Sequence, residues 1–236
     1  MKRIKFWVRK THKWLGLLLS VQLLLWVISG IYMTVIPLTN VHGNHLIKEA
    51  KPPVLDKQLW QPLSKSLIEQ YSPVESIRLT SRQHQPLYQL NTAQGAVYLD
   101  GTSGREVKPL SKLEIEAIAR NTIAFEAPVE SSVLLKQYPE ELGGRNKSVW
   151  QVNFNAEFNA SLYFHPVTGE LISKRSDIWR MFDFLWMLHI MDYDERSDVN
   201  NNLLFVSALT ALLFVTAGLW LLVYSFHRRS NHQEAV

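Results

Sequence analysis

Hydrophobic and polar residues fall into three blocks along this chain, and the outer two blocks are long apolar runs. The first run, residues 14–36, has twenty-three residues and contains no Asp, Glu, Lys, Arg or His. At about 1.5 Å rise per residue, a helix of this length crosses a hydrocarbon core of about 30 Å. A second apolar run covers residues 203–226. The pattern predicts two transmembrane α-helices with a polar block between them.

Basic residues outside the two runs indicate the direction in which the helices cross the membrane. Loops rich in Lys and Arg stay in the cytoplasm. The basic residues nearest the runs are Lys2, Arg3, Lys5, Arg9, Lys10, Lys13, Arg228 and Arg229. The tails, residues 1–13 and 227–236, are therefore expected in the cytoplasm and residues 37–202 outside it. The first run exceeds the apolar part of a signal peptide, about 7–15 residues, and no A-x-A-like site follows, which favours a retained anchor.

Composition excludes several classes of function. The formal net charge of +4 is concentrated in the tails, where it indicates contact with membrane lipid. The polar block lacks the basic patch that nucleic acid requires, so nucleic-acid binding is excluded. The chain has no Cys. This excludes a disulfide framework, a Cys-based zinc or iron–sulfur site, and c-type haem attachment, which needs C-x-x-C-H.

The polar block begins with an irregular connector and continues with a regular α+β pattern. Residues 37–60 contain several Pro and Gly and show no sustained period, as expected of a connector leaving the membrane. Residues 61–110 form a first unit. It has helical spacing of apolar residues over 62–71, then strands, and a hairpin that turns at 100–104.

A second unit, residues 111–177, repeats this order. Its helix is predicted over residues 111–125, with Ser111 as the N-cap and Glu114 completing a capping box. Strands follow, and the last of them form a hairpin that turns at residues 165–169. The sequence thus predicts a fold of the α+β class.

Two short similarities indicate that the two units are a tandem repeat. The tripeptide Val-Glu-Ser at residues 74–76 recurs at residues 129–131. Each unit also runs from an aromatic-bearing strand into a Thr-Gly or Thr-Ser-Gly turn, which we interpret as a hairpin turn. Together with the shared order of elements, these similarities predict two α+β units of similar fold.

Residues 178–193 are apolar for the most part but are too short and too polar to span a membrane. The run is interrupted by Arg180, Asp183, His189 and Asp192. Its aromatic and Met content is typical of a helix that lies at the membrane–water interface. We therefore expect an interfacial amphipathic helix here, at the outer surface.

Several of these segments resemble the PepSY-associated transmembrane family. Residues 11–16, THKWLG, resemble its His-x-Trp-x-Gly opening ahead of an apolar run. The hairpins at 98–106, YLDGTSGRE, and 163–173, YFHPVTGELIS, resemble the strand–turn–strand end of PepSY domains. Leu188-His189, followed by a further span, resembles the family's second histidine motif. The resemblance covers nearly the whole chain.

The resemblance implies two kinds of function. Members with four spans include inner-membrane reductases that accompany iron–siderophore uptake and carry haem b between histidines. Soluble PepSY domains are regarded as peptidase-inhibiting or protein-binding modules. This chain has two predicted spans instead of four, which leaves both kinds open.

Three residues at the cytoplasmic side are candidates for a haem site. A b-type haem in a membrane needs two neutral imidazoles, and small residues where the porphyrin lies. His12 and Gly16 are four residues apart and share a helix face. His227 follows the second run, and we expect it at the same membrane depth as His12. His12 and His227 are therefore candidate iron ligands, and Gly16 would leave room for the porphyrin.

A second candidate set lies at the outer side. His42 or His45 is expected at the same depth as His189, with Asp192 as a hydrogen-bond acceptor for His189. His12 and His189 are the preferred haem-iron ligands of the two sets. In the alternative interpretation, these histidines are ordinary polar groups at helix ends and in a loop, and they bind nothing.

The sequence therefore leads to two hypotheses of different class. In the first, the chain is an inner-membrane protein with a periplasmic PepSY domain that assists transmembrane electron transfer. It would be a component of a membrane oxidoreductase system that binds haem b and is linked to iron–siderophore reduction. A second copy of the chain or a partner membrane subunit would shield the haem, and a periplasmic redox partner would exchange electrons with it. In the second, it is a membrane-tethered periplasmic binding or regulatory module without a cofactor.

Overall fold

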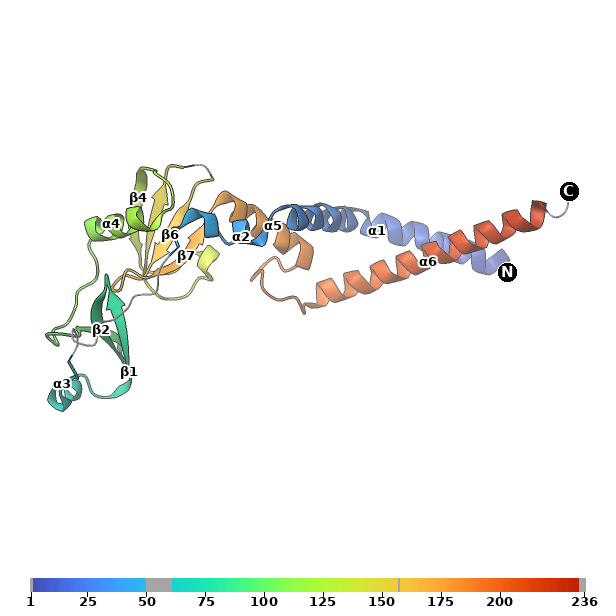
Figure 1. Cartoon of the computed structure of the whole chain (residues 1–236). Coiled ribbons are helices and arrows are strands. Elements are labelled where there is room, and N and C mark those ends of the chain that lie inside the picture. Colours follow the sequence, from blue (N-terminus) through green and yellow to red (C-terminus); the bar gives the residue numbers. More distant parts are fainter. Residues whose placement is uncertain (1, 50–60, 157, 234–236) are drawn as a thin grey trace. The chain divides into compact units, whose positions relative to one another are not determined.

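The computed structural model describes residues 2–49, 61–156 and 158–233, and among these it describes the side chains of residues 3–226. The chain divides into two compact units. The first unit comprises residues 1–38 and 180–236, and the second comprises residues 39–179 (Figure 1).

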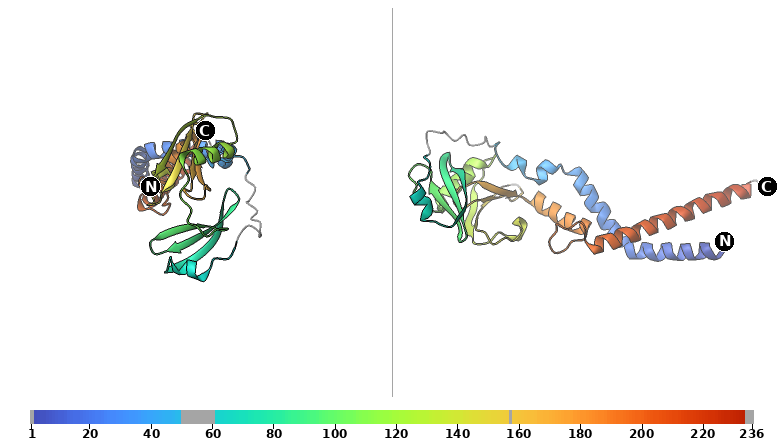
Figure 2. Two further views of the ribbon diagram at one scale, coloured as in Figure 1. Left: turned by 90° about the vertical axis from the view of Figure 1, so that its left-hand side faces the viewer. Right: turned by 90° about the horizontal axis from the view of Figure 1, so that it is seen from below.

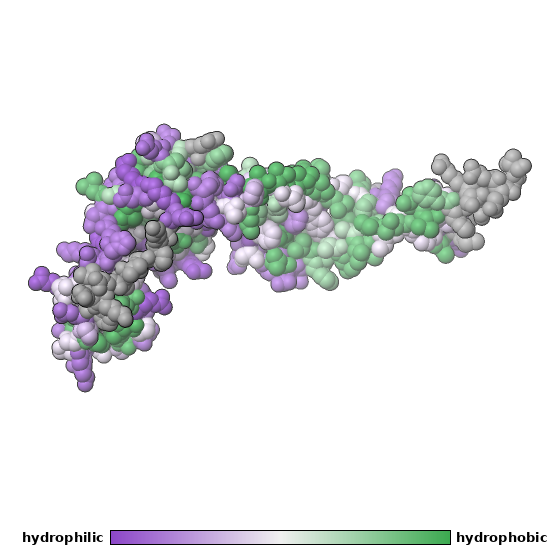
Figure 3. Space-filling view, viewed as in Figure 1, coloured by the Kyte–Doolittle hydropathy of each residue, from purple (hydrophilic) through white to green (hydrophobic). Residues whose placement is uncertain are grey.

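The first unit is built on two long helices, α1 (Lys2–Val35) and α6 (Asn202–Gln233). Both are long and apolar enough to cross a membrane, which confirms the helices predicted for the two apolar runs. Their large apolar side chains are mostly exposed, and apolar surface follows both helices in Figure 3. Exposed apolar surface of this extent is typical of helices that contact lipid or another protein.

A third helix, α5 (Asp177–Ile190), matches the run predicted over residues 178–193. Its residues 180–190 belong to the first unit. The side-chain amide of Asn201, just before α6, donates a hydrogen bond to the carbonyl of Ile190 at 2.9 Å. The end of α5 is thus tied to the start of α6. The interfacial position of α5 stays a prediction.

The second unit contains two separate antiparallel sheets (Figures 1 and 2). The three-stranded sheet has the order β1 (Val74–Arg82), β2 (Gln85–Thr92), β3 (Gly95–Asp100). The four-stranded sheet has the order β4 (Val129–Leu135), β5 (Val149–Phe154), β6 (Ser161–Phe164), β7 (Leu171–Arg175). Together with the helices, these sheets confirm the α+β class.

One helix precedes each sheet, as predicted. Before β1, α3 (Lys65–Glu69) is shorter than the expected 62–71 and begins at the N-cap Ser64. Before β4, α4 (Lys112–Thr122) has the predicted capping box. The backbone N–H of Ser111 donates to the Glu114 carboxylate at 2.7 Å, and the hydroxyl of Ser111 accepts from the Glu114 N–H at 3.4 Å.

The recurring Val-Glu-Ser tripeptide forms the same irregularity in both sheets. The pairing register shifts between Val74 and Ser76 in β1, and again between the equivalent residues of β4. A β-bulge of this kind places one extra residue on one strand. In both sheets, the Ser after the bulge accepts a hydrogen bond from an Asn of the next strand, at 2.8 Å from Asn91 and at 3.0 Å from Asn153. These shared details favour the tandem-repeat hypothesis.

The two Thr-Gly turns also share one hydrogen-bond pattern. In the first, the carbonyl of Asp100 accepts from the Gly104 N–H at 2.8 Å, and its carboxylate accepts from two backbone N–H groups of the turn. In the second, the carbonyl of His165 accepts from the Gly169 N–H at 3.0 Å, and its Nδ1 accepts from two N–H groups of the turn. Both glycines have φ near +70°, the left-handed region that favours glycine. The hairpin-turn interpretation of both segments is confirmed.

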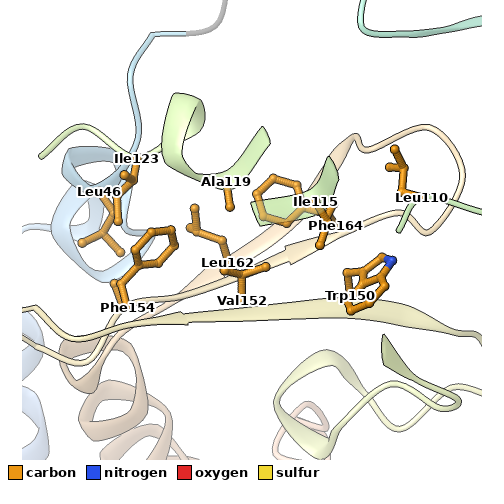
Figure 4. Packing of buried hydrophobic residues seen from close by; sticks show 11 residues of the cluster. Leu46, Leu110, Ile115, Ala119, Ile123, Trp150, Val152, Phe154, Leu162 and Phe164 are labelled. Atoms are coloured by element: carbon orange, nitrogen blue, oxygen red, sulfur yellow. The ribbon is translucent and has the colours of Figure 1, made fainter. Parts of the chain in front are cut away.

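The larger core lies between α4 and the four-stranded sheet (Figure 4). Its fully buried residues include Leu162 and Phe164 of β6 and Ile115 of α4. Leu46 also belongs to this core, and the adjacent Ile47 forms an antiparallel bridge with Ile123.

The segment from α2 (Leu38–Val41) to the 3-10 helix η1 (Asn44–Leu46) is therefore partly packed into the second unit. The sequence had predicted only an irregular connector here, over residues 37–60. The rest of that connector, residues 50–60, lies outside the described residues.

Candidate functional site

Three residues of α1 form a polar face that holds the end of α5. Gln22, Trp26 and Ser29 are spaced i, i+4 and i+7, so they lie on one side of the helix. The Gln22 side chain donates to the carbonyl of Leu188 at 3.2 Å, and the Trp26 indole donates to the carbonyl of His189 at 2.8 Å. Carbonyls in the last turn of a helix have no intrahelical partner. These side chains supply the missing hydrogen bonds.

The imidazole of His189 contacts the hydroxyl of Ser29, with 2.8 Å between Nδ1 and Oγ. Ser29 is fully buried, and its hydroxyl donates its one hydrogen to the carbonyl of Leu25 at 2.7 Å. We therefore assign the hydrogen in the contact with His189 to Nδ1, since the hydroxyl has one hydrogen and its contact with Leu25 is the shorter of the two. In the neutral ring, Nε2 then carries the lone pair that can bind a metal.

Asp192 does not accept this hydrogen bond, and the predicted role of Asp192 is wrong. Its carboxylate accepts hydrogen bonds from four backbone N–H groups of the loop that follows α5. The donors are the N–H groups of Asp194, Glu195, Ser197 and Asp198. The N–H groups of Asp198 and Ser197, followed by the other two, lower the pKa of Asp192. Asp192 therefore shapes the loop between α5 and α6.

His12 lies in the contact between α1 and α6. Its Nδ1 is 3.0 Å from the carbonyl oxygen of Phe214, and a carbonyl only accepts, so Nδ1 carries the hydrogen here as well. The His12 and Phe214 rings stack, with centroids 4.3 Å apart and planes within 2°. His12 thus has the same tautomer as His189, with Nε2 as the nitrogen that can bind a metal.

Two glycines allow these rings to fit between the helices. A Cβ on Gly16 would lie 2.8 Å from the Phe214 ring, and a Cβ on Gly218 would lie 2.8 Å from Cε1 of His12. Each ring therefore packs over a glycine of the opposite helix. The prediction that Gly16 leaves open room beside His12 is wrong, because the Phe214 ring occupies that space.

The register of the two helices separates His12 from His227. His12 is level with Gly218, and further along the pair the Lys5 ammonium lies 4.6 Å from the centre of the Tyr224 ring. His227 follows Gly218 by nine residues, about 13 Å along the helix axis. The predicted depth match between His12 and His227 is therefore wrong for this hairpin. The side chain of His227 lies outside the described residues.

His12 and His189 do not meet either. The partner of His189 is Ser29, which follows His12 by seventeen residues, about 25 Å along α1. Among the residues that the structure describes, no group of three or more His, Asp or Glu side chains is placed to hold a metal ion. His42 and His45 are exposed and belong to the second unit, so their predicted match with His189 stays a prediction.

The second unit has a cleft of about 840 Å³ beside the three-stranded sheet. Alternate residues of a strand face opposite sides. The apolar side of this sheet packs on α3, while its polar side faces the cleft together with the turn at residues 165–170. The polar groups that line the cleft include Arg78, Gln89, Tyr98, Lys147, His165 and Glu170.

Tyr98 and His165 form a hydrogen-bonded pair in this cleft, with 3.1 Å between Oη and Nε2. Nδ1 of His165 accepts the N–H groups of Val167 and Thr168, each at 3.2 Å. In the first turn the equivalent position is held by Asp100, whose carboxylate can only accept hydrogen bonds. This agrees with Nδ1 of His165 as a hydrogen-bond acceptor. Nε2 of the neutral ring therefore carries the hydrogen and donates it to Tyr98.

Burial lowers the pKa of His165, and Lys147 adds to this effect while Glu170 opposes it. Between that lowered pKa and about 6.5, the ordinary histidine pKa, the unfolded chain binds a proton that the folded chain does not. The free energy of unfolding should therefore decrease as the pH falls below about 6.5.

Urea unfolding of the wild type and of His165→Gln at pH 7.5 and at pH 5.5 measures this effect. The wild type should lose more stability than the variant, in which Gln can still accept the turn N–H groups. An equal loss in both proteins would contradict the pKa argument.

The sequence contained signals for some of these residues that our predictions did not use. Gln22 and Ser29 are polar residues within an apolar run, and with Trp26 they share one helix face. His165 occupies the same position in its turn as Asp100, which points to a structural acceptor. Tyr98 and Lys147 had no comparable signal.

No family model, curated protein or solved structure matches this chain. The similarity to PepSY-associated transmembrane proteins therefore rests on the short segments at residues 11–16, 98–106, 163–173 and 188–189.

Proposed function

We propose that this chain is a membrane-anchored haem b protein that assists electron transfer across the bacterial inner membrane. The single observation that carries the proposal is the shared hydrogen-bond state of His12 and His189. In both rings Nδ1 donates to a fixed oxygen, and Nε2 has no hydrogen-bond partner among the described residues.

This state is the one that a metal-binding histidine requires. A ligating imidazole is neutral, binds through one nitrogen and usually donates the hydrogen of the other nitrogen to a nearby acceptor. The carbonyl of Phe214 and the hydroxyl of Ser29 provide these acceptors. Each fixes both the tautomer and the orientation of its ring. When bound, haem b supplies an iron that takes up and releases one electron.

The separation of the two histidines determines how many haems such a protein would hold. Because they lie about 25 Å apart along α1, they cannot be the two axial ligands of one iron. Each would be half of a different site, one toward each end of the hairpin. A second copy of the chain, or a partner membrane subunit, would supply the other imidazole of each site.

The exposed surfaces of α1 and α6 support such an assembly. Leu18 of α1 and Phe205 of α6 are 74% and 68% exposed, although both side chains are apolar. Two hairpins packed together form a four-helix bundle, an architecture that holds cofactors between facing helices. The same apolar surfaces also suit contact with lipid.

Topology follows from the basic residues near the ends of the chain. Both termini are cytoplasmic in this proposal, and the second unit is periplasmic, where a redox partner would reach it. The assignment of the two sheets as tandem PepSY units is part of the proposal, supported by their matching bulges and turns. A link to iron–siderophore reduction rests on the sequence resemblance alone.

A second candidate function is a membrane-tethered binding module without a cofactor. The polar cleft of the second unit favours it, because a cleft of about 840 Å³ has the size of a small-molecule site. In that case the histidines of the hairpin would serve only in helix packing.

The ratio of haem to protein separates the two candidates. The full chain, expressed with ample haem supply and purified in mild detergent, should contain about one haem per chain and have the mass of a dimer. Two haems shared by two chains give this ratio. Protein that contains no haem as a monomer, as a dimer or with co-purified subunits would leave the binding module as the function.

A further inference from the structure

Three hydrogen-bond donors on the polar side of the three-stranded sheet lie next to one another on neighbouring strands and face the cleft. Arg78 of β1 pairs with Gln89 of β2, and Gln89 pairs with Tyr98 of β3. The three residues thus form one row across the sheet, and all three line the cleft. Guanidinium and ammonium groups only donate hydrogen bonds, so Arg78 and the nearby Lys147, both exposed, can donate to an acceptor group of a ligand.

Tyr98 adds a donor whose direction is fixed. His165 donates its Nε2 hydrogen to the Tyr98 oxygen, because its Nδ1 already accepts two backbone N–H groups. The hydroxyl hydrogen of Tyr98 is then available to a ligand and is not used by His165. Burial, assisted by the charge of Glu170, raises the pKa of Tyr98, so this hydroxyl keeps its hydrogen at neutral pH.

The charges of the cleft set the charge of its ligand. Arg78 and Lys147 carry two positive charges, Glu170 carries one negative charge, and His165 is neutral. A ligand with one negative charge balances this set, whereas a doubly charged phosphate would be opposed by Glu170. A planar carboxylate also matches the paired N–H groups of an arginine side chain.

The remaining lining indicates what accompanies the carboxylate. Ala96, Pro109 and Val167 provide apolar contacts. The Gln89 amide donates to the Asn91 side-chain oxygen at 2.9 Å, and Asn91 donates to Ser76, so for a peptide bond of the ligand these amides offer the Gln89 oxygen and their second N–H hydrogens. We propose that this cleft binds a small ligand that ends in a single carboxylate, of the size and polarity of a short peptide with a free C-terminus. Arg78 binds the carboxylate, Tyr98 donates to it, and His165 positions Tyr98.

This inference is independent of the haem proposal, because every residue of the cleft belongs to the second unit. The probe is N-acetyl-alanyl-alanine, titrated into the full chain in lipid nanodiscs and followed by ligand-observed NMR. The matched control ligand is the C-terminal amide of the same peptide, which lacks the charge. We expect the amide to bind about tenfold more weakly than the free acid, because it loses the charge-assisted hydrogen bonds.

Variants of the lining residues locate the site. Arg78→Gln should weaken binding of the free acid about tenfold, and Tyr98→Phe about threefold or more. Arg78 is exposed, and Phe keeps the ring of Tyr98, so both variants should fold. Lys136→Gln, an exposed residue outside the cleft, should bind like the wild type.

Three results would overturn the proposal. The acid and the amide could bind equally, which would exclude carboxylate recognition. Arg78→Gln and Tyr98→Phe could both bind as the wild type does, which would place the ligand elsewhere. The free acid could fail to bind while inorganic phosphate binds and depends on Arg78, which would assign the cleft to a phosphate.

Discussion

Replacing His189 with Asn should remove about half of the haem from the full-length protein, and replacing His12 should remove the other half. Each histidine belongs to a different site in our proposal, since the two lie about 25 Å apart along α1. A haem that loses one axial imidazole, or both where a second copy of the chain supplies the same histidine, is held weakly and is lost during purification. The double variant should contain no haem. The measurement is the ratio of haem to protein chain, compared among the wild type and variants that give the same yield of folded protein.

His84→Asn is the matched control for these variants. His84 lies in the turn between β1 and β2, is exposed, and has a left-handed φ of 69°, which Asn tolerates. The haem content of the His84→Asn protein should equal that of the wild type. If both single variants at His12 and His189 keep the full haem content, these residues are not the ligands, and His42, His45 and His227 become the residues to test.

Replacing Phe164 with Ala should destabilise the four-stranded sheet by about 3–5 kcal/mol. The Phe164 side chain is fully buried between α4 and the sheet, so its removal leaves a cavity in addition to the lost apolar contact (Figure 4). Hydrogen exchange of the backbone amides of β5 and β6, followed by mass spectrometry on the full chain, gives the free energy of opening of this sheet.

Phe158→Ala is the control for the same chemical change at a surface position. Phe158 is 45% exposed and lies in the loop before β6. Its removal should change the free energy of opening by no more than about 0.5 kcal/mol. Equal effects at Phe158 and Phe164 would contradict the assignment of the core.

Local sequence patterns were sufficient for the long helices and for the hairpin turns, but not for the short helices α2 and η1. The apolar runs predicted α1 and α6, and the capping box of Ser111 and Glu114 predicted the start of α4. Hairpin turns were predicted at Asp100 and at His165, since left-handed glycines and side-chain acceptors mark them within a few residues. All these features depend on contacts between residues that are close in sequence.

Contacts between distant segments were harder to predict, and the histidine pairing shows why. We placed His12 and His227 at one depth because both lie at the ends of the apolar runs that we expected on the cytoplasmic side. The runs are in fact staggered, because His12 packs over Gly218 and Phe214 packs over Gly16. Side-chain fit between two helices sets their register, and the ends of an apolar run do not contain that information.

The residues that form the cleft of the second unit were even harder to predict from the sequence than the register of the two helices. Tyr98 lies in β3 and His165 lies in the turn between β6 and β7 of the other sheet, so their hydrogen bond forms only once both parts are folded. The alternation of β2 and β3 does predict that Gln89 and Tyr98 are on opposite sides of their strands from Leu90 and Leu99. It does not predict which polar groups of the other sheet lie across from them.

The absorbance spectrum of the reduced full-length protein tests the central claim most directly. Iron bound by two imidazoles is low-spin, so dithionite-reduced protein should show a sharp α-band of the b type together with a Soret band. His189→Asn and His12→Asn combined should abolish both bands, while His84→Asn should leave them unchanged. Protein expressed with ample haem supply that shows no Soret band, alone or with co-purified subunits, would contradict the proposed function.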